Sequence, residues 1–204
     1  MRTMVVGGHS RNIGKTALVV DLIRAFPEAR WTAVKITQYG HGVCSINGEA
    51  CGCAPDEHAF ALDEEFDRNN RTDTSRFLVA GAVRSLWLRT KQGRLAEALP
   101  LLREGLLGAG NVLVESNALL QYFWPDLYLA VLDPAVEDFK PSARRFLDLV
   151  DALVLRSPLS ASAWPDVSPR LLAAKPRFLQ PLGQPLPAEL ADFVRRRFFR
   201  VRAA

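Results

Sequence analysis

The sequence predicts an α/β fold of three layers, in which a mostly parallel sheet is covered by helices on both faces. Short apolar runs alternate along the chain with segments of helical period, which is typical of strand–helix–strand units. These runs are apolar at nearly every position, as in strands buried on both faces. At 204 residues, 49% hydrophobic and 24% charged, the chain suits one domain spanning residues 1–204 and is unlike a disordered or membrane protein.

The turn near the start of the chain has the residues of a phosphate-binding loop. An apolar run at residues 4–6 leads into glycines, and Gly14 stands just before the helical segment, where backbone N–H groups can surround a phosphate only if side chains are small. Lys15 places an ammonium at the terminal phosphates, and Thr16 offers a hydroxyl to Mg²⁺. The helix start adds unpaired N–H donors and a positive dipole end. The expected nucleotide contacts from the loop are Gly8, Ser10, Asn12, Ile13, Gly14, Lys15, Thr16 and Ala17.

This P-loop is a variant of the usual pattern, which has a glycine five residues before the Gly-Lys pair. His9 stands at that place, and Gly8 precedes the pair by six residues. The alternative is a glycine turn that only connects a strand to a helix. The order of strand, loop, Lys-Thr and amphipathic helix favours nucleotide binding.

The remaining elements follow from periodicity and from glycine and proline positions. The first helix carries an apolar stripe and ends at Pro27, and Pro100 must lie near the start of a later helix or kink it. Ligands bind such sheets at the carboxyl ends of the strands. Further strands are expected at residues 31–37, 83–88, 111–116, 127–132, 152–155 and 177–179, and further helices at residues 74–82, 95–107, 142–150 and from residue 187.

Charge and the start of the chain indicate the compartment and the partners. The chain begins without the apolar stretch of a signal peptide and contains no run long enough to cross a bilayer, so we expect a cytoplasmic protein without a membrane partner. The formal charge is +4, and a solvated helix face explains the arginine cluster near the end more simply than nucleic acid does. That cluster comprises Arg195, Arg196, Arg197, Arg200 and Arg202.

Two charged residues at strand ends are candidates for the nucleotide site. Glu115 ends an apolar strand, where its carboxylate could reach Mg²⁺ or its water across from Thr16, so Lys15 and Glu115 are the candidate catalytic residues. The alternatives are a plain surface glutamate, or Asp133 in the same role. Lys35 lies in an apolar strand, where an unpaired ammonium would be costly unless it faces phosphate or the solvent-exposed edge of the sheet.

Residues 38–73 differ from the rest of the chain and are expected to form a long loop insertion over the nucleotide site. The segment contains Cys44, Cys51 and Cys53, followed by His58. Three thiolates and an imidazole can complete a tetrahedral zinc site, which would order a polar loop with little core of its own. The alternatives are three ordinary cysteines in a flexible loop, or an iron–sulfur cluster shared across a dimer.

Asp73 to Arg76 precede the next helical segment. The sequence Asp-Thr-Ser favours a helix N-cap, which leaves Arg76 to contact an anion. The alternative is a switch segment that senses the terminal phosphate.

Three segments together resemble the MobB-type proteins of molybdopterin-guanine dinucleotide biosynthesis. They are Gly-His-Ser-Arg-Asn-Ile-Gly-Lys-Thr at residues 8–16, Ala-Val-Lys-Ile-Thr at residues 33–37 with His41 after it, and Asp-Thr-Ser-Arg-Phe-Leu-Val-Ala-Gly-Ala at residues 73–82. The resemblance covers roughly the first 120 residues. It implies a P-loop fold of the dimerising SIMIBI type, hence a homodimer, GTP binding and a supporting role, with a partner protein, in molybdenum cofactor maturation.

The chain departs from this family at identifiable positions. Ile36 replaces the histidine that usually follows the strand lysine, and Ser116 replaces a glycine after Glu115. The spacing of the loop glycines is equally similar to that of dethiobiotin synthetase, an ATP-using ligase. Residues 155–158 also lack the carboxylate with which many GTP-binding proteins bind the guanine base. Three functions therefore stay open: a slow NTPase that binds Mg²⁺ with GTP or ATP, a small-molecule kinase or ligase, and a non-hydrolysing adaptor.

Overall fold

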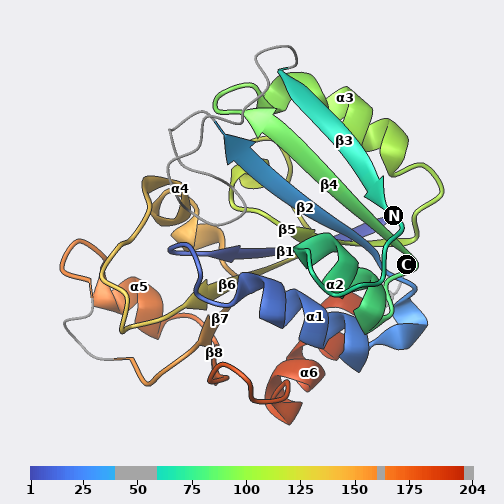
Figure 1. The fold of residues 1–204 in the computed structure, drawn as a ribbon. Helices are drawn as coiled ribbons and strands as arrows, with labels where there is room; N and C mark the ends of the chain where they lie inside the picture. Colours follow the sequence, from blue (N-terminus) through green and yellow to red (C-terminus); the bar gives the residue numbers. More distant parts are fainter. Residues whose placement is uncertain (40–58, 160–163, 200–204) are drawn as a thin grey trace, which may run out of the picture.

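A computed structural model describes residues 1–39, 59–159 and 164–199 (Figure 1). Its strands form one eight-stranded sheet in the order β3-β4-β2-β5-β1-β6-β7-β8. All described neighbours are parallel except β3 and β4, and the arrowhead of β3 in Figure 1 points opposite to its neighbours. The predicted α/β fold is confirmed. The strands are β1 Arg2–Gly8, β2 Thr32–Tyr39, β3 Phe60–Glu65, β4 Arg84–Lys91, β5 Asn111–Glu115, β6 Leu127–Leu132, β7 Ala152–Leu155 and β8 Arg177–Leu179.

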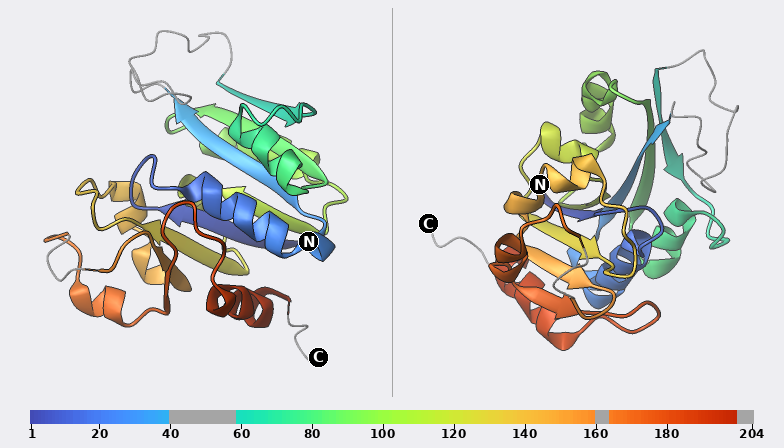
Figure 2. Two further views of the ribbon diagram at one scale, coloured as in Figure 1. Left: turned by 60° about the horizontal axis from the view of Figure 1, so that its bottom comes forward. Right: turned by 90° about the vertical axis from the view of Figure 1, so that its left-hand side faces the viewer.

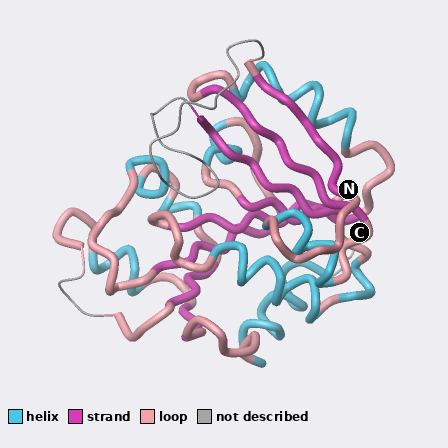
Figure 3. The backbone as a smooth tube through the Cα atoms, viewed as in Figure 1, coloured by secondary structure: helices cyan, strands magenta, loops and turns pink. Residues whose placement is uncertain are grey.

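Helices cover both faces of the sheet (Figure 2), and the strands run between them (magenta in Figure 3). Successive residues of β1 point to opposite faces, so Val5 joins one core cluster and Met4 and Val6 join the other. The Val5 cluster packs against α3, α4 and α5, and the other against α1, α2 and α6. The helices are α1 Lys15–Ala25, α2 Asp73–Ala80, α3 Leu95–Gly105, α4 Pro141–Arg144, α5 Pro169–Ala173 and α6 Ala188–Val194, with short helical turns η1 Pro27–Ala29, η2 Ala118–Gln121, η3 Leu147–Leu149 and η4 Arg195–Phe199.

The ends of the first two helices follow from local chemistry. Helix α1 ends just before Pro27, as the proline predicts. Thr72 caps α2 through a reciprocal pair of bonds with Ser75. Gly81 ends α2 with a φ of 114°, a conformation that favours glycine.

Three sequence-based expectations need correction. Residues 38–73 are not all loop, because Phe60–Glu65 adds an antiparallel edge strand. Phe60 and Leu62 in its first half pack against the core cluster, and its second half is acidic. Glu64 bonds Arg84 at 2.7 Å and Asp63 pairs with Arg89, so charge pairs add to the contacts with the neighbouring strand. Of the two positions expected for Pro100, the one near the helix start is wrong, because Pro100 lies inside α3, on the exposed side, and the helix continues past it.

The prediction of one continuous helix over residues 142–150 is also wrong. It breaks into α4 and η3, with Phe146 at the junction outside helical geometry. This break lets Phe146, Leu147 and Val150 all reach the same core cluster, which outweighs the local helical period. In the described part of the chain, no helix is long and apolar enough to cross a membrane.

Removal of the buried Leu18 side chain tests the packing of α1 on the sheet. Leu18 is 0% exposed, so Leu18→Ala should lower the free energy of unfolding by about 2–5 kcal/mol through lost burial and a cavity. Urea denaturation followed by circular dichroism measures the change. Leu107, which is 73% exposed, is the matched control, and a similar loss in Leu107→Ala would contradict the assignment.

Candidate nucleotide-binding site

The phosphate loop lies at the centre of the sheet, because β1 runs between β5 and β6. Gly14 has a φ of 83° and caps α1 without a side-chain hydrogen bond, which leaves the helix N-terminus open to an anion. A Cβ on Gly14 would lie 2.5 Å from Leu182 Cδ2, and one on Gly8 would lie 2.8 Å from Ile13 Cδ1. The left-handed backbone is therefore the main reason for glycine at Gly14, and the neighbouring side chains leave little room for another residue at either position.

The Lys15 ammonium folds back onto the loop. Its Nζ donates to the Ser10 carbonyl oxygen at 2.6 Å. Burial is the main reason why the pKa of Lys15 is lowered, and the nearby Lys35 and Arg11 charges act in the same direction. An anion in the loop would relieve this cost, so the lysine suits phosphate binding.

Glu115 meets both Thr16 and Lys35. Strand register places Glu115 beside Val6 on one side and Lys35 on the other. The Thr16 hydroxyl donates to Glu115 Oε2 at 2.8 Å, and Lys35 Nζ lies 3.4 Å from Oε1. The structure thus brings together the predicted metal-site pair of Thr16 and Glu115, and it pairs Lys35 with a carboxylate rather than leaving it at a free edge.

Asp73 belongs to the segment for which the sequence allowed two roles, a helix N-cap or a switch that senses the terminal phosphate. The N-cap of α2 is Thr72, and the Asp73 carboxylate instead bonds Lys35 and lies 3.3 Å from Arg76. Burial alone would lower the pKa of Lys35, but the Glu115 and Asp73 carboxylates outweigh it and raise that pKa. Lys35 therefore stays charged and ties the start of α2 to the metal-site glutamate.

Arg156, immediately after β7, bonds the phosphate loop from the side of β1 away from Glu115 and β5. Its guanidinium is buried and donates to the carbonyl oxygens of Ile13 at 3.1 Å and Gly14 at 2.6 Å. It also donates to Gln180 O at 2.9 Å and to Gln180 Oε1 at 3.1 Å, and the Gln180 amide donates to Asp21. Arg156 directly follows a predicted strand, so the rule that ligands bind at the carboxyl ends of parallel strands places it near the site. The sequence gives it no role, because its partners in the loop are backbone atoms distant in sequence.

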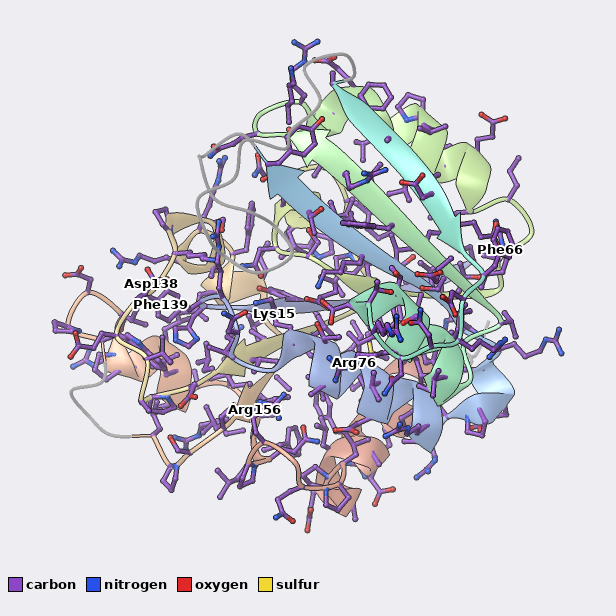
Figure 4. All side chains as sticks on the ribbon, in the orientation of Figure 1. Lys15, Phe66, Arg76, Asp138, Phe139 and Arg156 are labelled. Carbon is purple, nitrogen blue, oxygen red and sulfur yellow. The ribbon has the colours of Figure 1, made fainter. Side chains whose placement is uncertain are left out.

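The segment after β6 is bonded to the start of the loop. The Ser10 hydroxyl donates to Asp138 Oδ2 at 2.6 Å, and the Lys140 N–H donates to the His9 carbonyl oxygen at 2.8 Å. Figure 4 labels Asp138 and Phe139, which follow β6, and Arg156, which follows β7. They lie around Lys15, which follows β1. Asp133, the alternative metal-site acid, instead accepts the Ala135 N–H in a local turn.

His9 is buried and does not face phosphate. Its ring packs between Phe139 and Trp164, and Nε2 lies 3.2 Å from the Val136 carbonyl oxygen. Because a carbonyl only accepts, Nε2 carries the proton, and Nδ1 has no hydrogen-bond partner among the residues that the structure describes. Burial lowers the pKa of His9, so the ring is a neutral packing element.

The predicted zinc ligands Cys44, Cys51, Cys53 and His58 lie outside the described residues. Within residues 1–39, 59–159 and 164–199, no cluster of three or more His, Cys, Asp or Glu side chains is arranged to hold a metal ion. Zinc binding by the cysteine segment therefore stays a prediction.

The sheet, the glycine loop ending in Lys15-Thr16 and the acid on the adjacent strand define the P-loop nucleotide-binding class of α/β proteins. No protein-family model matches the chain, and no curated protein matches it.

Solved structures resemble this fold at low identity. LpxK from Aquifex aeolicus in complex with ATP is 17% identical with a TM-score of 0.46, over 88% of this chain and 53% of that one, so this chain spans about half of its length. HypB from Helicobacter pylori in complex with nickel is 14% identical with a TM-score of 0.49, over 98% and 90% of the two chains. A MobB homologue from Bacillus stearothermophilus is 16% identical with a TM-score of 0.39, over 88% of each.

Removal of the Arg156 guanidinium should destabilise the chain. Arg156→Gln leaves the buried Ile13 and Gly14 carbonyl oxygens without these donors, so we expect a loss of about 1–3 kcal/mol in the free energy of unfolding. Urea denaturation measures it. Arg170→Gln, at an exposed site, is the control, and equal stability of the two variants would show that the Arg156 bonds contribute nothing.

Proposed function

We propose that the chain binds a Mg²⁺–nucleoside triphosphate and hydrolyses it slowly, in a supporting role in molybdenum cofactor guanine dinucleotide biosynthesis. The observation that carries the nucleotide part is the 2.8 Å bond from the Thr16 hydroxyl to Glu115, next to a half-buried lysine on a glycine loop. The biosynthetic role rests on the resemblance of three sequence segments to MobB-type proteins.

The oxygen donors at Thr16 and Glu115 fit Mg²⁺. This hard cation prefers hydroxyl and carboxylate oxygens and is usually held by one or two protein carboxylates together with phosphate. The Thr16 and Glu115 oxygens are already within hydrogen-bond distance, and Glu115 is almost fully buried. When bound, Mg²⁺ would neutralise charge on the phosphate oxygens.

The side chains around the loop would act mainly by position and charge. Lys15 would exchange the Ser10 carbonyl for a terminal phosphate oxygen, and the open N-terminus of α1 would supply N–H donors. Lys35 stands 3.4 Å from Glu115 and supplies a positive charge beside this buried carboxylate. Lys15 and Glu115 are therefore the proposed catalytic residues, and phosphoryl transfer by positioning and neutralisation needs no covalent intermediate on the protein.

Replacement of Lys15 tests nucleotide binding directly. Lys15→Ala should weaken binding of Mg²⁺–GTP and Mg²⁺–ATP at least tenfold, because it removes the cation that meets the terminal phosphates. Isothermal titration calorimetry measures the affinities. Glu115→Gln keeps the shape but removes the charge, so it should weaken the effect of Mg²⁺ on affinity. Unchanged binding by Lys15→Ala would disprove the proposed site.

A small-molecule kinase or ligase is the second candidate. It is favoured by the charged group of Lys35, Asp73 and Arg76, which lies beside Glu115 without belonging to the loop. Such a group could hold a polar acceptor next to the terminal phosphate.

The choice of nucleotide separates the two candidates. The biosynthetic role predicts that GTP binds more tightly than ATP in Mg²⁺ buffer, because the MobB resemblance implies GTP. The kinase or ligase predicts ATP preference and turnover that depends on a small substrate. Calorimetric titration of the same preparation with both nucleotides decides between them.

Three further features belong to the proposal. The resemblance to MobB-type proteins supports a homodimer and a partner protein of cofactor biosynthesis. The thiols of Cys44, Cys51 and Cys53 with His58 support a zinc site, which a metal assay of the purified protein would test.

A further inference from the structure

We propose that Lys140 is a second lysine of the phosphate site, which contacts the terminal phosphate of the bound nucleoside triphosphate. This inference rests on the proposed nucleotide binding and adds a residue from outside the loop. It follows from the way in which the segment after β6 is bonded to the loop.

Backbone and side-chain bonds fix this segment against residues 9 and 10. The His9 N–H donates to the Val131 carbonyl oxygen at 3.2 Å, and the Lys140 N–H donates to the His9 carbonyl oxygen at 2.8 Å. The Ser10 hydroxyl adds a 2.6 Å bond to Asp138. The Phe139 ring, buried against His9, lies between these attachments and holds the segment in place.

Lys15 and Lys140 are both bonded to the first part of the loop, at two consecutive carbonyl oxygens. The Lys15 ammonium is bonded to the Ser10 carbonyl oxygen, and the Lys140 backbone is bonded to the carbonyl oxygen one residue earlier. The four-carbon stem of Lys140 starts beside the loop, so its ammonium can reach the phosphate that Lys15 meets. Lys140 comes from the β6 side of β1, whereas Thr16 and Glu115 meet on the β5 side, so the two groups would hold the phosphate chain from opposite sides.

The charges around Lys140 call for an anion. Burial, followed by the positive charges of Lys15 and Arg11, lowers the pKa of Lys140 to about 8, although Asp138 acts in the opposite direction. The Asp138 carboxylate already accepts the Ser10 hydroxyl, and His9 is neutral. Among the described residues, no carboxylate forms an ion pair with Lys140. Three cations thus converge on one loop, and a terminal phosphate would neutralise them.

The experiment compares the affinities of Lys140 variants for nucleoside triphosphate analogues and for diphosphates. Calorimetric titrations use the Mg²⁺ complexes of guanosine and adenosine 5′-(β,γ-imido)triphosphate and of the corresponding diphosphates. Lys140→Ala should weaken triphosphate binding about tenfold and diphosphate binding much less, because it removes a cation at the terminal phosphate. Lys140→Arg keeps the charge and should retain most of the affinity.

The pH dependence gives a readout that a purely structural lysine would not change. An anion binds best to the protonated lysine, and the uncharged lysine should bind about as weakly as alanine. The pKa of about 8 therefore predicts that triphosphate affinity of the unaltered chain falls about fivefold from pH 7 to pH 9. Arginine stays charged over this range and alanine carries no charge. The fall should therefore be much smaller in both variants, even though Lys140→Arg binds more tightly.

Lys175→Ala is the matched control. It removes a half-buried lysine, whose ammonium donates to the Asp148 carbonyl oxygen, just before β8 and therefore at the ends of the strands away from the phosphate loop. It should bind and titrate like the unaltered chain. If Lys140→Ala binds the triphosphate normally, the inference is wrong while nucleotide binding stands. If the unaltered chain binds no nucleotide, the proposed function itself fails. If Lys140→Ala does not fold, the pH profiles of Lys140→Arg and the unaltered chain decide, and identical profiles overturn the inference.

Discussion

The Glu115 carboxylate is the group on which the site depends, because it accepts the Thr16 hydroxyl with one oxygen and faces the Lys35 ammonium with the other. Burial of a polar or charged group is costly unless it has hydrogen-bond or ion-pair partners, and Thr16 and Lys35 supply them here. Strand register fixes this arrangement, since Val6, Glu115 and Lys35 stand side by side on three neighbouring parallel strands. The site is therefore as rigid as the centre of the sheet.

The phosphate loop is stabilised from three directions. Strand β5 contributes Glu115, the segment after β6 contributes Asp138 and the Lys140 backbone, and the end of β7 contributes the Arg156 guanidinium. A loop whose N–H groups must point toward a ligand directs several of its carbonyl oxygens outward, and these oxygens need donors. Arg156 and the Lys140 N–H supply such donors, so the residues that shape the loop also bring positive charge near it.

Parts of the fold and site could be predicted because their causes are local. The strands are short apolar runs, α1 starts after Gly14 and stops at Pro27, and Glu115 follows from the rule that parallel strands present their carboxyl ends to a ligand. The edge strand at residues 60–65 was missed, because only its first half is apolar and its acidic second half pairs with Arg84 and Arg89 on the neighbouring strand. The broken helix after Pro141 was missed for a related reason, since three core contacts outweighed its period.

The sequence by itself determined the class of the protein, because a glycine turn, a lysine and a helix start that are adjacent in the chain are necessarily adjacent in space. Only the tertiary structure decided the partners of these residues. Arg156 lies 142 residues from the Gly14 carbonyl that it bonds, and Asp138 lies 128 residues from Ser10. The sequence favoured Asp73 as part of a helix cap, whereas the structure pairs it with Lys35, which β2 places next to it. Sequence spacing carries no information about such contacts, since strand order in the sheet creates them.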